Sequence, residues 1–381
     1  MTEGTCLDIH YGDVLIKYGE VLDAGGERIP HIADDQKASS LSCPPLQDGD
    51  VIIADTSEDE AVGRCSELRN VDGRTIYSGL HTMPCRPNEA FAPGYLGYYL
   101  NSDAYHSQLL PLMQGIKVIS VSRSAIEDIG VCYPSLPEQR AISSLFSSLN
   151  SLITLHQRKH DKLATLKKSL LEKMFPKPGS DVPELRFAGF TEPWEQRKLG
   201  DITRRITRKN EGESDLPLTI SAQCGLVDQR TFFNNQVASK DMSGYYLLRE
   251  GEFAYNKSTS GESPWGAVKR LEKYEKGCVS TLYICFALDG ADPDFLITYY
   301  ETDRWYKAVQ IIAAEGARNH GLLNIAPDDF FDTFLTLPSS REEQERIGSL
   351  FARLDNLITL HQRKHDQLAT LKKSLLDKMF V

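Results

Sequence analysis

One segment of the chain occurs twice. Residues 152–175 read LITLHQRKHDKLATLKKSLLEKMF and residues 357–380 read LITLHQRKHDQLATLKKSLLDKMF, so only Lys162→Gln and Glu172→Asp separate the copies. A repeat this close, in a chain of 381 residues, predicts two halves built in a similar way, each containing one copy.

Both copies have a helical pattern that begins well upstream. In the first half, apolar residues recur at helical spacing without an intervening Gly or Pro at Ile142, Leu145, Phe146, Leu149, Leu152, Ile153, Leu163, Leu166, Leu170 and Met174. Ser135 with Glu138, and Ser340 with Glu343, match the capping-box spacing at a helix start. The pattern predicts two helices of about 38 residues, each about 57 Å long at about 1.5 Å per residue.

Polar residues interrupt the apolar stripe in the middle of each copy. They are His156, Lys159 and His160 in the first, and His361, Lys364 and His365 in the second. Polar layers in a helix seam usually set register rather than add stability. Parallel and antiparallel pairing would both align the two layers, so the pattern alone leaves the direction open. The alternative is a metal-binding or pH-sensing histidine pair, but no cysteine stands at ligand spacing, and we expect no metal site.

Composition and motif content narrow the class of protein. Hydrophobic residues make up 41% of the chain and charged residues 25%, which are globular values. We find no run of 18 apolar residues and no signal-peptide pattern, and the eight cysteines show no zinc spacing. We therefore predict a cytoplasmic protein with reduced, mostly buried thiols and no membrane span.

The charge is distributed unevenly. The net charge is −10, which argues against nucleic-acid binding by the whole surface. Residues 1–137 carry 9 basic and 20 acidic groups, whereas residues 138–175 carry 7 basic and 3 acidic groups. Any anion-binding role must therefore use local clusters of basic side chains.

The chain reads as globule, helix, linker, globule, helix. The expected parts are a mixed, strand-rich globule at 1–134, a long helix at 135–175, a Pro- and Gly-rich linker at 176–193, a second globule at 194–338 and a second long helix at 339–381. Within the globules we expect strands at 13–17, 50–55, 251–255 and 279–288, and helices at 93–110 and 293–313. The fold class is α+β, with two mixed α/β globules, two long helices and twofold pseudo-symmetry.

Several stretches resemble the specificity subunits of type I restriction-modification systems. They are Pro183–Phe190 with Trp194–Asp201, Pro134–Gln139 and its echo Leu337–Gln344, Gly79–Thr82, and Tyr255–Ser260. The resemblance covers nearly the whole chain, including its order of parts. It implies two target recognition domains, each reading one half of a bipartite DNA site, held apart by two antiparallel helices that set the unread spacer.

The resemblance also implies partners and a division of chemistry. Double-stranded DNA, two methyltransferase subunits and motor-nuclease subunits would be the partners. S-adenosylmethionine would be bound by the methyltransferase, and ATP and Mg by the motor-nuclease, so this chain would hold no cofactor. The residues agree, because we find no Walker A loop, GxGxxG after a strand, HExxH, GxSxG or Asn/Asp-Pro-Pro-aromatic motif. We expect no catalytic residue, although a scaffold protein and an enzyme that itself modifies DNA are competing hypotheses.

Two expectations concern the helices. Because two similar globules must each reach one half-site, we predict that the helices pack antiparallel with His156 near His361. We also predict that helix length, and not the globule sequence, sets the spacer. The basic residues Arg158, Lys159, Lys162, Lys167 and Lys168 could lie near the spacer DNA, face solvent or meet a partner subunit.

Candidate DNA contacts in the second globule fall in three places. They are the loop Asn256, Lys257, Ser258, Thr259 and Ser260, the segment Arg318, Asn319 and His320, and the basic residues Arg204 and Arg205 with Arg208 and Lys209. Hydroxyl, amide and cationic groups suit phosphate contacts, and an asparagine can read an adenine edge. The alternatives are an ordinary polar loop for the first and a solvated charged loop for the last.

In the first globule the candidate stretches are Asp55–Ser57, Gly79–Thr82 and Gly115–Lys117, and the contacts expected within them are Thr56, Ser57, His81, Thr82 and Lys117. His81 has a structural alternative, as a histidine bonded in the core. This globule also departs from the family, because nothing before Gly4 corresponds to Trp194 and Lys198–Asp201. We therefore expect it to be clipped at its N-terminus, and to be the less stable and weaker-binding half.

Overall fold

Two long helices contain the repeated segments. Helix α6 spans Leu136–Lys173, with 38 residues, and α12 spans Arg341–Met379, with 39 residues, close to the expected length. The computed structural model describes residues 5–33, 38, 43–221, 225–233, 238–261, 263–313 and 321–380. Among these residues no helix combines the length and apolarity needed to cross a membrane.

The chain forms two compact units, and each contains part of each long helix. The first unit comprises Met1–Arg158 and His361–Val381, and the second comprises Lys159–Leu360. In the first unit, His156 Nδ1 on α6 lies 2.9 Å from His361 Nδ1 on α12. Phe146 lies ten residues earlier on α6, and its ring centroid is 5.8 Å from that of Phe380, beyond the end of α12.

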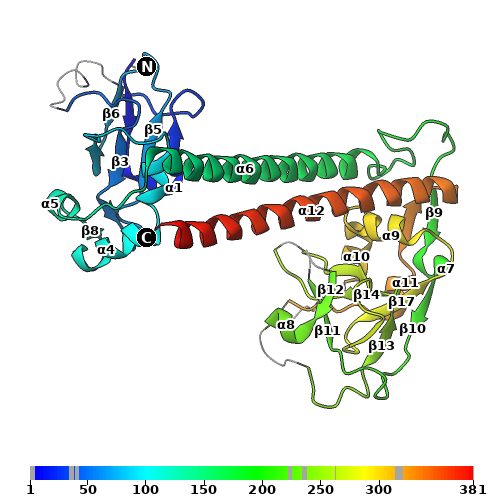
Figure 1. Ribbon diagram of the computed structural model, residues 1–381. Coiled ribbons are helices and arrows are strands. Elements are labelled where there is room, and N and C mark those ends of the chain that lie inside the picture. Colours follow the sequence, from blue (N-terminus) through cyan, green and yellow to red (C-terminus); the bar gives the residue numbers. More distant parts are fainter. Residues whose placement is uncertain are drawn as a thin grey trace. The chain divides into compact units, whose positions relative to one another are not determined.

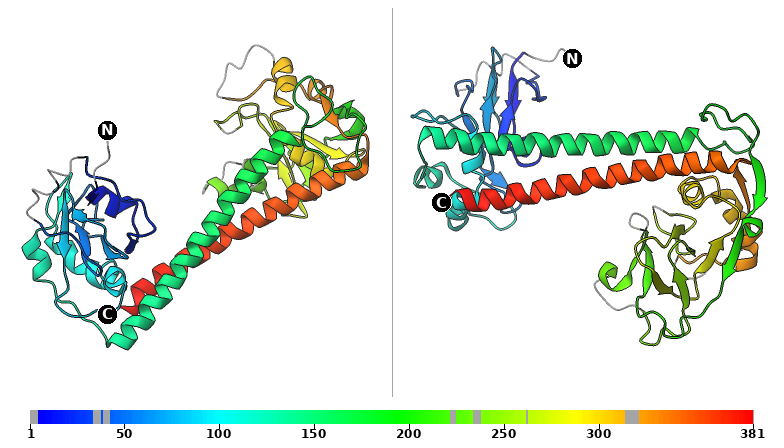
Figure 2. Two further views of the ribbon diagram at one scale, coloured as in Figure 1. Left: turned by 90° about the horizontal axis from the view of Figure 1, so that it is seen from above. Right: turned by 45° about the vertical axis from the view of Figure 1, so that its right-hand side comes forward.

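The second unit shows the same direction. Lys167 Nζ on α6 is 2.5 Å from Asp355 Oδ1 on α12, and the ring of Phe175, farther along the chain, lies 6.1 Å from that of the earlier Phe351. A later position on one helix thus meets an earlier position on the other. The helices pack antiparallel within each unit (Figures 1 and 2), and the prediction that places His156 near His361 is confirmed.

The first unit carries a small mixed sheet and short helices. Its elements are β1 (Leu7–Ile9), α1 (Tyr11–Ile16), β2 (Val21–Asp23), β3 (Val51–Ala54), β4 (Thr56–Ser57), β5 (Cys65–Arg69), β6 (Ile76–Ser78), β7 (Thr82–Cys85), α3 (Tyr95–Tyr99), α4 (Asp103–Leu109), η1 (Leu110–Leu112), β8 (Ile119–Ser120) and α5 (Arg123–Glu127). The main sheet has the order β2-β5-β3-β7, in which only β2 and β5 are parallel. All four residues of β3 are buried, as an apolar run in the centre of a sheet should be.

The second unit carries an antiparallel sheet with the order β10-β17-β14-β15. Its elements are β9 (Glu195–Lys198), α7 (Leu199–Ile202), β10 (Thr203–Ile206), β11 (Leu218–Ser221), β12 (Gly225–Asp228), α8 (Gln229–Phe233), β13 (Tyr246–Arg249), β14 (Phe253–Asn256), β15 (Ala267–Arg270), β16 (Lys276–Val279), β17 (Ile284–Leu288), α9 (Pro293–Tyr300), α10 (Tyr306–Ile312), α11 (Pro327–Phe331) and β18 (Phe334–Leu337). Strand β9 pairs separately with β18.

Each globule is attached to its long helix by the same hydrogen bonds. Gln139 Oε1 on α6 accepts from Ala92 N at 3.0 Å, and its Nε2 donates to Pro134 O at 2.8 Å. Gln344, the corresponding residue of α12, accepts from Asp292 N at 2.9 Å and donates to Pro338 O at 2.8 Å. The two junctions are equivalent in these contacts, while a twofold relation between whole units remains a prediction.

Some expected elements are wrong in type or length. Residues 13–17 are not a strand but lie largely in α1, whose start is capped by His10 Nδ1 accepting from Gly12 N at 3.2 Å. The helix expected at 93–110 is two helices, because Ser102 Oγ donates to Tyr99 O at 2.6 Å where α3 ends. Thr302 makes the same bond to Tyr299 O, at 2.7 Å, and divides the helix expected at 293–313.

Three further expectations need correction. The strand expected at 279–288 is interrupted, because β16 ends at Val279 and β17 begins at Ile284. Glu343 does not serve a capping box; its carboxylate is buried and accepts from Arg186 Nε and Nη2 at 2.6 and 2.8 Å. The described cysteines form no disulfide, but only Cys65, Cys278 and Cys285 are buried.

Candidate nucleic-acid interface

In the second unit, the loop that follows β14 is shaped by its own polar groups. Asn256 Oδ1 accepts from Ser258 N at 3.0 Å, which turns the chain as soon as the strand ends. Thr259 N and Oγ1 both donate to Gly321 O, at 2.6 and 3.0 Å. Ser258 and Ser260 remain exposed. The loop is therefore fixed against the segment that begins at Gly321 and presents two hydroxyl groups outward.

Lys257 is less available than its sequence suggested. Its side chain is half-buried, and Nζ donates to Ile325 O at 3.3 Å. Burial lowers the pKa of this ammonium group. Lys257 thus joins two segments of the unit, and the exposed hydroxyl groups beside it are better placed to meet a ligand.

The predicted contacts Arg318, Asn319 and His320 lie outside the described residues. The described chain resumes at Gly321, directly after them, and Gly321 O is the acceptor for Thr259. Thr259 and Gly321 are thus hydrogen-bonded although they are separated by more than fifty residues of sequence.

Arg204 and Arg205 belong to a different part of the sheet. Arg205 pairs in register with Phe286, and Phe286 with Phe253, which is three residues before Asn256 on β14. Arg204 Nε lies 3.7 Å from Asp289, and Arg205 Nη1 lies 3.2 Å from Asp328. The structure therefore does not bring these arginines to the loop at 256–260.

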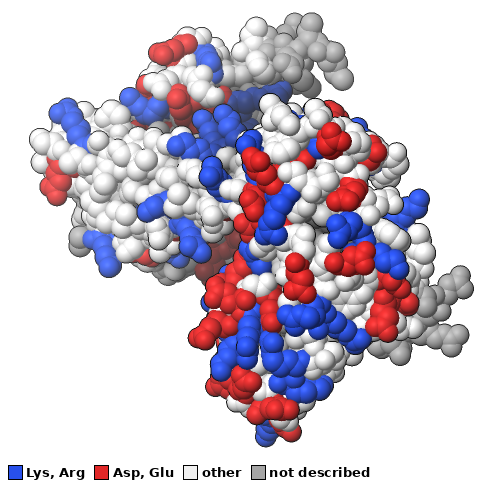
Figure 3. All heavy atoms as spheres, turned by 90° about the vertical axis from the view of Figure 1, so that its right-hand side faces the viewer, with Lys and Arg blue, Asp and Glu red and all other residues white. Residues whose placement is uncertain are grey.

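The remaining members of the basic cluster are also partnered. Arg208 Nη2 donates to Glu252 at 2.7 Å, and Lys209 Nζ donates to Gly244 O at 2.9 Å and lies 4.7 Å from the ring centroid of Tyr246. Figure 3 shows basic and acidic side chains interspersed over the face that it draws. The described residues of this face therefore do not form a uniformly basic surface.

In the first unit, the loop after β3 occupies the equivalent position. Thr56 and Ser57 form β4, which pairs antiparallel with Ser120 and Ile119 of β8. Lys117 lies in the turn that precedes β8, where Gln114 and Ser120 exchange two backbone hydrogen bonds of 2.9 and 2.8 Å. In the second unit, Ser258 makes the corresponding antiparallel bridge with Leu322. Both units therefore join the loop after a central strand to a returning segment.

His81 and Thr82 lie beside this loop. His81 Nδ1 is 3.3 Å from Asp55 Oδ1 and 3.4 Å from Thr56 Oγ1, and its side chain is 47% exposed. The alternative that His81 is bonded in the core is therefore wrong. Thr82 Oγ1 donates to Gly79 O at 2.7 Å, so Thr82 closes its own turn.

Asp55, the first residue of the candidate stretch Asp55–Ser57, belongs to this cluster, although the sequence did not show that it meets His81. It precedes Thr56 directly, and its carboxylate also accepts from Thr56 Oγ1 at 2.7 Å. A carboxylate repels phosphate but can accept from the amino group of a cytosine in the major groove. The cluster of Asp55, Thr56 and His81 is thus chemically suited to base edges rather than to phosphates.

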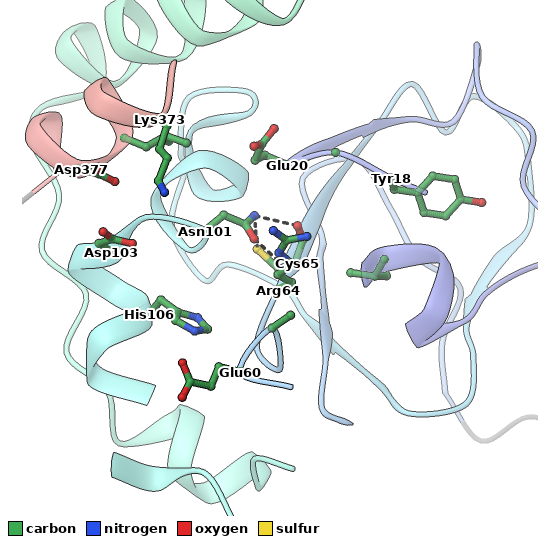
Figure 4. A pocket seen from close by; sticks show the side chains of 14 residues that line it. Tyr18, Glu20, Glu60, Arg64, Cys65, Asn101, Asp103, His106, Lys373 and Asp377 are labelled. Atoms are coloured by element: carbon green, nitrogen blue, oxygen red, sulfur yellow. Dashed lines mark hydrogen bonds between the residues drawn. The ribbon is translucent and has the colours of Figure 1, made fainter. Parts of the chain in front are cut away.

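One hollow of about 560 Å³ lies in the first unit (Figure 4). Lys373 points into it from α12, and Asp103 and His106 face it from α4. Burial holds the pKa of the neighbouring Cys65 thiol well above its usual value, which removes it as a nucleophile. Among the described residues no group of three ligating side chains is arranged to hold a metal ion, and we assign no chemistry to this hollow.

Comparison with known proteins identifies the fold. No family model matches the sequence, and no curated protein matches it. The crystal structure of the type I restriction-modification system S subunit from M. genitalium covers 99% of this chain and 92% of its own, with 12% identity and a TM-score of 0.51. This chain has the fold of a type I specificity subunit. The expected fold class, mixed α/β globules with two long helices, is confirmed.

Two other solved structures are similar to this specificity-subunit fold. The HsdS subunit from Thermoanaerobacter tengcongensis covers 93% of this chain and 85% of its own, with 18% identity and a TM-score of 0.43. A structure described as the basis of complex assembly and conformational transition of the type I R-M system covers 98% and 90%, with 18% identity and a TM-score of 0.45.

Proposed function

We propose that this chain is the DNA sequence-recognition subunit of a type I restriction-modification complex and is not itself catalytic. The observation that carries the proposal is the fold match to the M. genitalium S subunit, which extends over 99% of the chain. The order of parts and the quoted sequence stretches point to the same family without depending on that match.

In this proposal each unit reads one half of a bipartite target through the loop that follows its central strand. In the second unit the contacts are Asn256, Ser258, Thr259 and Ser260, together with Arg318, Asn319 and His320. In the first unit they are Asp55, Thr56, Ser57, His81 and Lys117. Their hydroxyl, amide and carboxylate groups have the donor and acceptor chemistry that distinguishes base edges in the major groove.

Contacts to DNA phosphates require basic side chains that can exchange their carboxylate partners for a phosphate. Arg204 and Arg205 are paired with Asp289 and Asp328 at exposed positions, where an ion pair contributes only about 0–1 kcal/mol. Exchange of such a carboxylate for a DNA phosphate therefore loses little folding free energy. Lys117 is exposed and has no ion pair among the described residues. We expect a modest salt dependence of DNA binding, set by a few cations.

The chemistry belongs to the partners in this proposal. Two methyltransferase subunits dock on the long helices and bind S-adenosylmethionine, and motor-nuclease subunits bind ATP and Mg. The chain itself supplies target choice and spacing. It needs no cofactor for that role, because recognition uses hydrogen bonds and charge alone.

Methylation mapping tests the proposal. The chain is co-expressed with a candidate methyltransferase subunit from the same organism, in a host without adenine methylation, and modified adenines are mapped over the genome. We expect one bipartite motif with a fixed gap, and none when either protein is omitted. Methylation by the chain alone, methylation of one contiguous motif, or a stable complex that methylates nothing would each contradict the proposal. In a matched pair of variants, N256A should alter one half of the motif, whereas K273A, on the same unit but outside the loop, should leave it unchanged.

A further inference from the structure

In the second unit, the segment that leads into β9 packs against aromatic residues at the ends of α6 and α9. Trp194 is 3% exposed, and its ring lies 5.8 Å from that of Phe175 and 5.7 Å from that of Phe295. The chain continues into β9, which pairs with β18 over all four residues. Arg186, eight residues before Trp194, binds the buried carboxylate of Glu343.

The first unit has an aromatic cluster that corresponds to the rings packed against Trp194 in the second unit. The ring of Phe380, the repeat equivalent of Phe175, lies 5.9 Å from Tyr95 and 5.6 Å from Tyr99. In the second unit Phe175 lies 5.7 Å from Phe295 and 6.2 Å from Tyr299. The two ring clusters are therefore built from corresponding positions at closely similar separations.

The first unit differs in what covers this surface. Residues 130–133 correspond to β18, yet no strand of the described residues pairs with them. Val131 and Tyr133 are 39% and 46% exposed, whereas Leu335 and Leu337 of β18 are 2% and 3% exposed. In the second unit β18 is paired and buried, whereas the corresponding residues 130–133 of the first unit are exposed and not paired with a strand of the described residues.

A hollow of about 250 Å³ lies at this place in the first unit. It is lined by the aromatic and apolar residues Tyr95, Tyr99, Ile142, Met379 and Phe380, with Tyr133 and Glu138 at its side. Glu138 is the repeat equivalent of Glu343, and it is exposed and has no ion pair among the described residues. The hollow therefore offers three features found in the second unit. Its aromatic rings correspond to those that contact Trp194, and Glu138 corresponds to the carboxylate that binds Arg186. The backbone of residues 130–133, with which no strand of the described residues pairs, corresponds to the strand that pairs with β9.

We propose that this hollow binds a polypeptide segment that offers a tryptophan followed by a β-strand, with an arginine about eight residues before it. The tryptophan fills the hollow, the strand pairs with residues 130–133, and the arginine meets Glu138. Recognition of this kind takes its affinity from main-chain pairing and its specificity from the side-chain pocket. The inference rests on the internal repeat and does not depend on the proposed DNA-recognition role.

A labelled peptide with the sequence of residues 183–200 is the probe. Its binding to the full-length chain is measured by fluorescence anisotropy. We expect saturable binding that weakens about tenfold or more when the peptide carries W194A. The same loss is expected when the protein carries E138K, which reverses the acidic group, or M379W, which fills the hollow.

The matched control is E127K, because Glu127 is another exposed acid of the first unit that does not line the hollow. It should leave the affinity unchanged. Absence of saturable binding would overturn the inference. So would binding that survives both E138K and M379W, since the peptide would then be seated elsewhere, or binding that is insensitive to loss of its tryptophan.

Discussion

The ion pair between Arg186 and Glu343 provides a sharp test of how the second unit is held together. The two side chains are 12% and 1% exposed, and two hydrogen bonds of 2.6 and 2.8 Å join them. Replacing Arg186 by alanine leaves a buried carboxylate without a partner, which typically costs about 3–5 kcal/mol. For a unit of this size each kcal/mol lowers Tm by about 2–4 °C, so R186A should lower it by about 6–20 °C.

Tryptophan fluorescence during urea or thermal unfolding reads this unit alone. The three tryptophans of the chain, Trp194, Trp265 and Trp305, all lie within it. The double variant R186A/E343Q should recover part of the loss, because it removes the buried charge as well.

The control is R204A. Arg204 and Asp289 are 66% and 56% exposed, and loss of such a pair should cost less than about 1 kcal/mol. If R186A costs no more than R204A, the segment at 176–193 does not fasten the start of α12 and the reasoning is wrong.

Three further predictions concern packing and pH. G348A should destabilise the second unit by about 1–3 kcal/mol, although alanine favours helices, because its Cβ would stand 2.5 Å from Phe295 N; equal or higher stability in urea unfolding would contradict this. W194F should cost less than about 1.5 kcal/mol and W194A about 3–5 kcal/mol, because the buried Trp194 Nε1 has no hydrogen-bond partner among the described residues; a large loss for W194F would show that the nitrogen is bonded. Burial raises the pKa of Tyr95 and of Tyr299 to about 12, so the neutral phenols stabilise the fold below pH about 10 and that stability is lost as the pH rises toward 12. Tyrosinate absorbance and circular dichroism should therefore change together between these two pH values. Ionisation of all tyrosines near pH 10 with the fold intact would refute the prediction.

The long helices were predictable because their signal is long and regular. An apolar stripe carried over about five heptads outweighs single-residue exceptions, and the 205-residue repeat fixes which positions correspond. Short elements lack such redundancy. Residues 13–17 match a strand in composition, yet they lie largely in a short helix whose start is capped by His10. At the ends of α3 and α9 the hydroxyl groups of Ser102 and Thr302 bond back to the carbonyl groups of Tyr99 and Tyr299, and a periodicity argument overlooks such bonds.

The candidate site was predictable in part. Asp55–Ser57 and Gly115–Lys117 were chosen as separate stretches, and the β4–β8 pairing joins the first to the residues that directly follow the second. Arg204 and Arg205 were chosen for charge alone, and the sheet register places them away from the loop at 256–260. The role of Glu343 was missed because its partner, Arg186, lies in a segment that composition classed as a linker. Side-chain pairing across long sequence separations is decided by tertiary packing, and no local pattern encodes it.

The central claim is that two recognition units read one bipartite site at a distance fixed by the long helices. Its most direct test maps the methylated motif for a variant with one heptad inserted at corresponding positions of both α6 and α12. Seven residues add about 10 Å of helix, which equals about three base pairs at about 3.4 Å each. The account predicts both half-sites unchanged and the gap between them longer by about three base pairs. An unchanged gap in an active variant would contradict it.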